Sequence, residues 1–128
     1  MLIALSGCGD DSGLAVHPGG DDVLSVTVTS PNLERPISLE RAQRMPLDHG
    51  PYTVRIVYAD RQEVWLGFFH ADAGRRRTVD LYVTRNVGAD TVDVRETANS
   101  GDSLKTLFTG RTRLQDTSEQ KPYLLDWL

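Results

Sequence analysis

The feature that most constrains the fold is a repeated alternation of apolar and polar residues with a period of two. It is clearest in residues 52–58, which read Tyr52, Thr53, Val54, Arg55, Ile56, Val57 and Tyr58. Successive side chains of a β-strand point to opposite faces of a sheet, so this pattern predicts a strand with one buried face. The short gap at residues 59–62 before the next apolar run predicts a hairpin.

The same rhythm recurs along much of the chain, and no convincing long helix interrupts it. Further strands are predicted over residues 23–29, 37–40, 64–70, 79–84 and 92–95. Residues 64–70 are apolar on both faces, as expected of a central strand, which places Trp65 in the core. Short strands at close spacing predict an all-β fold, an antiparallel β-sandwich. The length of 128 residues suits one domain, and its core is predicted over residues 23–97.

The C-terminal part of the sequence is less regular. Residues 98–128 are predicted to be an irregular extension that docks on the sandwich or on a partner, with a polar loop over residues 97–102. Residues 104–111 fit the spacing of a helix and of a strand, and Gly110 interrupts either. The chain ends in an apolar segment that includes Tyr123, Leu124, Leu125 and Trp127. This segment is either a final strand or turn that docks on the domain, or an exposed peptide that binds a partner.

The net charge of −4 comes entirely from the first 22 residues. These carry four aspartates and no Lys or Arg, so the rest of the chain holds 14 of the 18 acidic residues and all 14 basic ones. A body of balanced charge lacks the one-sided basic surface that binding to nucleic acid requires. We therefore do not expect nucleic acid among the partners.

The sequence offers no strong pattern of an enzyme or a metal site. His17, His49 and His70 are scattered and are interpreted as surface histidines, without a His-x-His or HExxH spacing. Asp72 would share a strand face with His70, but Gly74 favours a turn there. No Gly-x-Ser-x-Gly motif is present to supply an activated serine. We expect neither catalysis nor a cofactor.

One basic cluster stands out, formed by Arg75, Arg76 and Arg77. It is either a solvated hairpin tip, with nearby Asp72 and Asp80 offsetting part of its charge, or a contact for anionic lipid head groups or an acidic partner. The second interpretation depends on the bidentate geometry with which guanidinium groups bind phosphate and carboxylate.

The tetrad Leu5-Ser6-Gly7-Cys8 contains the only cysteine of the chain and resembles the lipobox of bacterial lipoproteins. The resemblance implies that Cys8 is acylated and becomes the N-terminus of an exported protein. Residues 1–22 are then a truncated lipoprotein signal followed by a flexible acidic linker. Gly9, in place of an aspartate after the cysteine, implies the outer rather than the inner membrane. Two or three acyl chains would hold the protein almost permanently, at about 0.8 kcal/mol for each buried methylene.

A second resemblance lies in the middle of the chain. Residues 47–56, Leu-Asp-His-Gly-Pro-Tyr-Thr-Val-Arg-Ile, resemble the leucine–x–x–glycine–x–tyrosine–x–valine signature of small transthyretin-like sandwiches. These include carboxypeptidase regulatory-like and PEGA-type modules, and the fold is also immunoglobulin-like. Gly50 permits a tight turn, Pro51 fixes φ, and Tyr52 is expected to turn its ring inward and offer its hydroxyl to the backbone. Such modules are mostly accessory or adhesive, so the resemblance predicts architecture rather than activity.

Three functions of different class follow from these observations. The favoured one is a non-catalytic, membrane-tethered β-sandwich that acts as a structural or accessory component of a bacterial cell-envelope assembly through protein–protein contacts. The second is a module that binds a glycan or another envelope polymer, and the third is a small metal-binding protein or enzyme. The sequence leaves the partner and the oligomeric state open.

Overall fold

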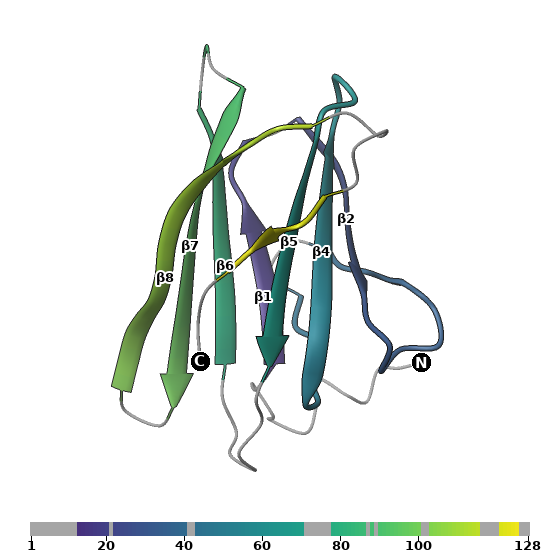
Figure 1. Cartoon of the computed structure of the whole chain (residues 1–128), viewed down its shortest axis with the longest axis vertical. Coiled ribbons are helices and arrows are strands. Elements are labelled where there is room, and N and C mark those ends of the chain that lie inside the picture. The colour runs from purple at the N-terminus through teal and green to yellow at the C-terminus, as the bar shows by residue number, and fades with distance from the viewer. Residues whose placement is uncertain are drawn as a thin grey trace.

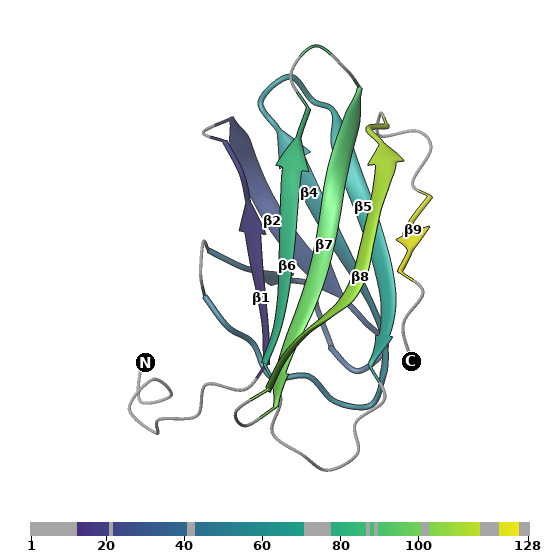
Figure 2. The same ribbon diagram turned by 90° about the vertical axis from the view of Figure 1, so that its left-hand side faces the viewer.

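The computed structural model describes residues 13–20, 22–40, 43–70, 78–86, 88, 90–100, 103–115 and 121–125. Within these ranges the chain forms nine strands and no helix, so the predicted all-β fold is confirmed. The strands build two sheets that pack face to face as a β-sandwich (Figure 1; Figure 2). In chain order the strands are β1 (Gly13–Pro18), β2 (Val23–Thr29), β3 (Ile37–Ser38), β4 (Gly50–Tyr58), β5 (Glu63–His70), β6 (Thr78–Arg85), β7 (Thr91–Ser100), β8 (Ser103–Arg113) and β9 (Tyr123–Leu124).

The sheets have four and five strands, in the orders β1-β6-β7-β8 and β3-β2-β4-β5-β9. Their interior pairings are antiparallel, as predicted, with β4 and β5 forming a hairpin and β6, β7 and β8 a meander. Two pairings at the edges are parallel: β1 lies along β6, and β9 lies along β5. Each sheet is therefore mixed, because the first and last strands arrive from distant parts of the chain.

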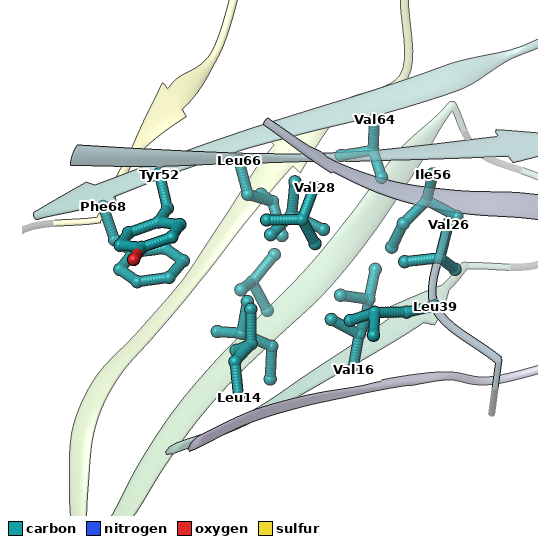
Figure 3. Close-up of a cluster of buried hydrophobic side chains, with 14 of the residues drawn as sticks. Leu14, Val16, Val26, Val28, Leu39, Tyr52, Ile56, Val64, Leu66 and Phe68 are labelled. Carbon is teal, nitrogen blue, oxygen red and sulfur yellow. The ribbon is translucent and has the colours of Figure 1, made fainter. Parts of the chain in front are cut away.

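The core lies between the sheets and is built by the alternate residues that the period-two pattern marks as apolar. Inward side chains of the five-stranded sheet include Val28 and Leu66, and they face Leu14 and Val16 of the other sheet (Figure 3). All four are at most 2% exposed. Burial of apolar surface contributes about 25 cal/mol per Å², so these contacts supply most of the favourable free energy of folding.

The predicted role of Tyr52 at the start of β4 is confirmed. Its ring is 2% exposed and stacks on Phe68, with the ring centroids 5.6 Å apart. The backbone N–H of Asp48 donates a hydrogen bond of 2.8 Å to the Tyr52 hydroxyl. Gly50 has a φ of +144°, and a Cβ there would lie 2.8 Å from Nδ2 of Asn32, so the turn before β4 needs glycine.

The flexible linker predicted over residues 1–22 is wrong for Gly13–Pro18, which form β1. Leu14, Ala15 and Val16 are all at most 2% exposed, and Leu14 exchanges two backbone hydrogen bonds with Met45 on its free side. The run is only three apolar residues long and has polar, Gly-rich neighbours on both sides. A parallel strand also takes its partner from far along the chain, which local pattern cannot reveal.

The polar loop predicted over residues 97–102 is wrong up to residue 100, because β7 continues to Ser100. The open choice for residues 104–111 is settled in favour of a strand, since β8 spans Ser103–Arg113 and pairs with β7 along its length. An irregularity in the register at Glu96 and Thr97 places an additional residue, Leu107, in β8. Such a bulge disturbs the alternation, which explains the ambiguous spacing.

Candidate protein-interaction surface

The residues predicted to bind a membrane or a partner divide into two groups. Cys8, the triplet Arg75, Arg76 and Arg77, and Trp127 lie outside the described residues. Tyr123, Leu124 and Leu125 are described and lie at the edge of the five-stranded sheet, where β9 runs beside β5 (Figure 2). Among the described residues, the predicted partner contact can therefore be located only at this edge of the sheet.

The segment around β9 docks on the sandwich by alternate residues. Leu125 is 5% exposed and belongs to the core, and its N–H donates a 2.8 Å hydrogen bond to the carbonyl of Gly67. Tyr123 also packs against the core and meets the edge of the Phe108 ring, with the centroids 5.8 Å apart. These two side chains close the side of the sandwich between β8 and β5, so they contribute to the fold.

Leu124 points the other way, to the outer face of the sheet, and is 72% exposed. It lies over Gly67 of β5, where a Cβ would approach its Cδ2 atom to 2.9 Å and the Cβ atom of Pro122 to 3.3 Å. The missing side chain at Gly67 thus makes room for Leu124 and Pro122 on the outer face. Of Tyr123, Leu124 and Leu125, only Leu124 is exposed.

Two aromatic residues of β5 share this outer face with Leu124. Trp65 and Phe69 alternate with the buried Val64, Leu66 and Phe68 and so point outward. Phe69 is 48% exposed, and Trp65 is half-buried, which corrects the prediction that Trp65 lies in the core. We call Trp65, Leu124 and Phe69 the apolar row. The sequence predicts cover on both faces of β5, because both faces are apolar. Within the described chain, however, no layer covers its outer face.

An ion pair fixes one end of the apolar row. Arg55 of β4 donates from Nε and Nη2 to the two carboxylate oxygens of Glu63, each at 2.8 Å. Trp65 donates from Nε1 to the same carboxylate at 2.8 Å, and the Arg55 guanidinium lies 5.5 Å from the centroid of its ring. Glu63 is 1% exposed, and its hydrogen bond raises the pKa of Arg55. The indole is therefore held in one orientation.

The prediction of surface histidines is confirmed for His49, which is exposed, and is wrong for His70, which is buried, while His17 is half-buried. His70 is buried at the end of β5, and His17 donates a 2.7 Å hydrogen bond from Nε2 to Asp80. His49 meets the Phe69 ring edge-on at 5.0 Å. Asp72, considered as a partner of His70, lies outside the described residues. Among the residues that are described, no group of three or more His, Cys, Asp or Glu residues is placed to hold a metal ion.

A hollow of about 630 Å³ lies at the end of the sandwich where β4 turns into β5 and β6 leads to β7. Asp22, Asp60 and Asp90 line it together with Arg85. Arg85 binds two of these carboxylates, with Nη1 3.1 Å from Asp22 and Nη2 in contact with Asp60, and this bonding lowers the pKa of Asp60. Arg85 thus offsets one of the three negative charges, and the hollow keeps a net acidic character.

One buried acidic residue, Glu96, was not among the residues predicted from the sequence. Glu96 of β7 is fully buried, and its two carboxylate oxygens have no hydrogen-bond partner in the described structure. It lies between Leu81 of β6 and Phe108 of β8 in the sheet register. Burial raises the pKa of Glu96 to about 8. The sequence does indicate this burial, because Glu96 lies on the same strand face as the apolar residues Val92 and Val94.

None of the described residues forms a helix long and apolar enough to cross a bilayer. No protein-family model matches the chain, and neither a curated protein nor a solved structure matches it. The arguments about function therefore depend on the residues themselves.

Proposed function

We propose that this protein is a non-catalytic lipoprotein of the bacterial cell envelope, anchored through Cys8, that takes part in an assembly through protein–protein contacts at the apolar row. The lipobox-like tetrad supports the anchor and the envelope location. The contact is carried by one observation: Phe69 and Leu124 are 48% and 72% exposed side by side with Trp65 on the outer face of the five-stranded sheet.

The chemistry of the apolar row suits a protein partner. Contact surfaces between proteins are enriched in aromatic residues, and a few well-held side chains supply most of the binding free energy. Trp65 is held by Glu63, so ordering its side chain on binding costs little. Arg55, whose side chain is 41% exposed, borders the row and supplies a polar rim. Leu124 lies between Tyr123, which packs against the core, and the buried Leu125, so the row has a firm base.

A glycan is the second candidate ligand, and the outward position of Trp65 favours it. Trp65 and Phe69 are four residues apart on one strand face, a separation of roughly 13 Å. Aromatic rings at such a spacing can bind separate sugar units. Leu124 lies between them over Gly67, and this aliphatic side chain favours the protein partner instead.

A crosslinking experiment separates the two candidates. A photoreactive phenylalanine analogue is placed at position 69 in one variant and at position 104 in a control, since Leu104 is 69% exposed on the other sheet. We expect position 69 to form one defined crosslink to a protein in envelope preparations and position 104 to form none. Equal crosslinking at both positions, or none at either, contradicts the proposal.

The glycan alternative has its own readout. Binding of the unmodified chain to isolated peptidoglycan is measured by sedimentation, with Trp65→Ala and Leu104→Ala compared. Sedimentation that Trp65→Ala abolishes and Leu104→Ala preserves would replace the protein partner by a glycan. Under our proposal neither variant changes the sedimented fraction.

The anchor is tested by intact mass. The chain is expressed in a bacterium as a precursor with a complete export signal ahead of Leu5, and the membrane-bound product is weighed. We expect loss of all residues before Cys8 and the added mass of acyl chains, and we expect Cys8→Ser to release the protein into the soluble fraction. An unmodified thiol on a full-length cytosolic chain contradicts the proposed location.

A further inference from the structure

A second hollow lies on the outer face of the four-stranded sheet. Figure 2 shows this face of the sheet turned toward the viewer. The hollow measures about 510 Å³ and crosses β6, β7 and β8. Its side chains come from alternate residues of these strands, namely Tyr82, Thr84, Asp93, Arg95, Thr109 and Arg111. We call it the arginine hollow. Its volume is in the range of sites for small ligands.

A row of stacked side chains forms one wall of the arginine hollow. His17, Tyr82 and Arg95 are register partners on β1, β6 and β7. The rings of His17 and Tyr82 stack with centroids 4.6 Å apart and an angle of 14° between their planes. The guanidinium carbon of Arg95 lies 4.7 Å from the centroid of the Tyr82 ring. The aromatic pair thus provides a platform for the arginine.

Two further residues, Asp80 and Arg44, hold the His17 ring of this platform in place. Asp80 of β6 accepts hydrogen bonds from His17 Nε2 at 2.7 Å and from Arg44 Nη2 at 2.8 Å. Arg44 also donates to the carbonyl of Gly13 at 3.0 Å, which ties it to the start of β1. The orientation of Arg95 therefore depends on a connected chain of side chains from several elements.

The charges in the hollow leave Arg95 unbalanced. Arg111 is paired with Asp93, whose carboxylate accepts a hydrogen bond from its Nε atom at 2.6 Å. Asp80 is likewise balanced by Arg44. Arg95 is exposed and, among the described residues, forms no ion pair with a carboxylate. The hollow thus presents one uncompensated guanidinium on an aromatic support, beside the hydroxyl groups of Thr84 and Thr109.

We infer that the arginine hollow is a binding site for the carboxylate or phosphate group of a small ligand. The planar guanidinium of Arg95 matches two oxygens of such a group and keeps donors free while it stacks on Tyr82. The two threonine hydroxyls supply further donors at the same hollow. Because Arg95 is already held in one orientation, it loses little side-chain entropy on binding. This raises its affinity for a ligand above that of a mobile surface arginine. The site lies on the opposite sheet from the apolar row and does not depend on the anchor.

Titration of the full chain with inorganic phosphate and, separately, with glucuronate tests this inference, with the backbone and Arg95 side-chain N–H resonances observed by NMR. We expect saturable shifts centred on Tyr82, Arg95 and Thr109 with at least one of the two ligands. The ligand that binds more tightly identifies the oxyanion as phosphate or carboxylate.

Variants make the test specific. Arg95→Gln is expected to weaken binding at least roughly tenfold, and Tyr82→Leu to weaken it several-fold while the charge is kept. Arg35→Gln, the same change of charge at an exposed residue of the other sheet's loop, is expected to change affinity less than about twofold. Absence of saturable shifts, or an equal loss in Arg95→Gln and Arg35→Gln, would overturn the inference. Far-ultraviolet circular dichroism confirms that each variant is folded.

Discussion

Glu96 shows how a single residue can set the pH response of a whole domain. Its carboxyl group lies between the sheets, without a hydrogen-bond partner in the described structure, and burial raises its pKa from 4.5 to about 8. The folded protein therefore holds this proton more tightly than the unfolded chain does. Between about pH 4.5 and 8 the unfolded state ionises first, so the free energy of unfolding falls as pH rises, by at most about 1.4 kcal/mol per pH unit.

Glu96→Gln is expected to remove this pH dependence. The neutral amide has nearly the same shape, so at pH 4 the variant should unfold at the same denaturant concentration as the parent. At pH 8 it should be more stable by a few kcal/mol, because the unfolded parent gains an ionised carboxylate and the variant does not. Urea unfolding at both pH values measures the difference.

Glu34→Gln serves as the control for this measurement, since Glu34 is exposed in the loop after β2. It should follow the parent at both pH values. A Glu96→Gln variant whose stability falls with pH as steeply as that of the parent would show that the carboxyl does not lose its solvation on folding.

At the scale of one element, the segment formed by β9 and the next residue, Leu125, combines a structural role with the proposed binding role in adjacent leucines. Leu125 is 5% exposed and Leu124 is 72% exposed. Leu125→Ala should lower the free energy of unfolding by about 2–4 kcal/mol, because it leaves a cavity in the core. Leu124→Ala should change it by less than about 0.5 kcal/mol. Thermal or urea unfolding of the two variants measures this contrast, and equal losses would mean that β9 is not docked as described.

The elements also show where sequence pattern succeeds and fails. Strands β4 and β5 were predicted nearly to their ends, since β4 alternates and β5 is a continuous apolar run, and the two pair across a short turn. Strand β1 was missed because its partner β6 begins at Thr78, far along the chain, and local pattern carries no record of that pairing. Strand β8 stayed ambiguous because its bulge breaks the alternation.

The candidate sites were less predictable than the strands. The apolar character of Trp65 and Phe69 is plain in the sequence, but which face of β5 is covered depends on the packing of the whole sandwich. The arginine hollow requires His17, Tyr82 and Arg95 to meet across three strands, and this follows from register alone. The sequence pattern predicts which residues share a face of one strand. The order and register of the strands decide which residues of different strands meet.

For the whole molecule, the topology relates the predicted anchor to the basic triplet. Gly13 is the register partner of Thr78, the residue that directly follows Arg77 in the chain. Cys8 and the triplet Arg75, Arg76 and Arg77 thus connect to the same end of the four-stranded sheet. Acyl chains and basic residues at one end would act together on an anionic bilayer.

Replacing Arg75, Arg76 and Arg77 together by Gln should weaken binding of the acylated protein to vesicles containing anionic lipid by more than tenfold, at roughly 1 kcal/mol for each arginine. Binding to neutral vesicles should stay unchanged. The double variant Arg61→Gln and Arg113→Gln, at the other end of the strands, is the control and should bind as the parent does. Equal affinity of the triple variant and the parent for anionic vesicles would contradict a role for the triplet.

The early start of β1 has a consequence for how the anchored protein would meet its surroundings. Five residue steps join Cys8 to Gly13, a span of roughly 18 Å at full stretch. With so short a linker, the anchored sandwich would have one end against the lipid. Its strands would then run along the membrane normal, and the outer faces of both sheets would be perpendicular to the membrane plane. We therefore expect binding partners to approach the sandwich laterally, from within the layer next to the membrane. A partner fixed far from the bilayer would have to extend toward the membrane to reach it.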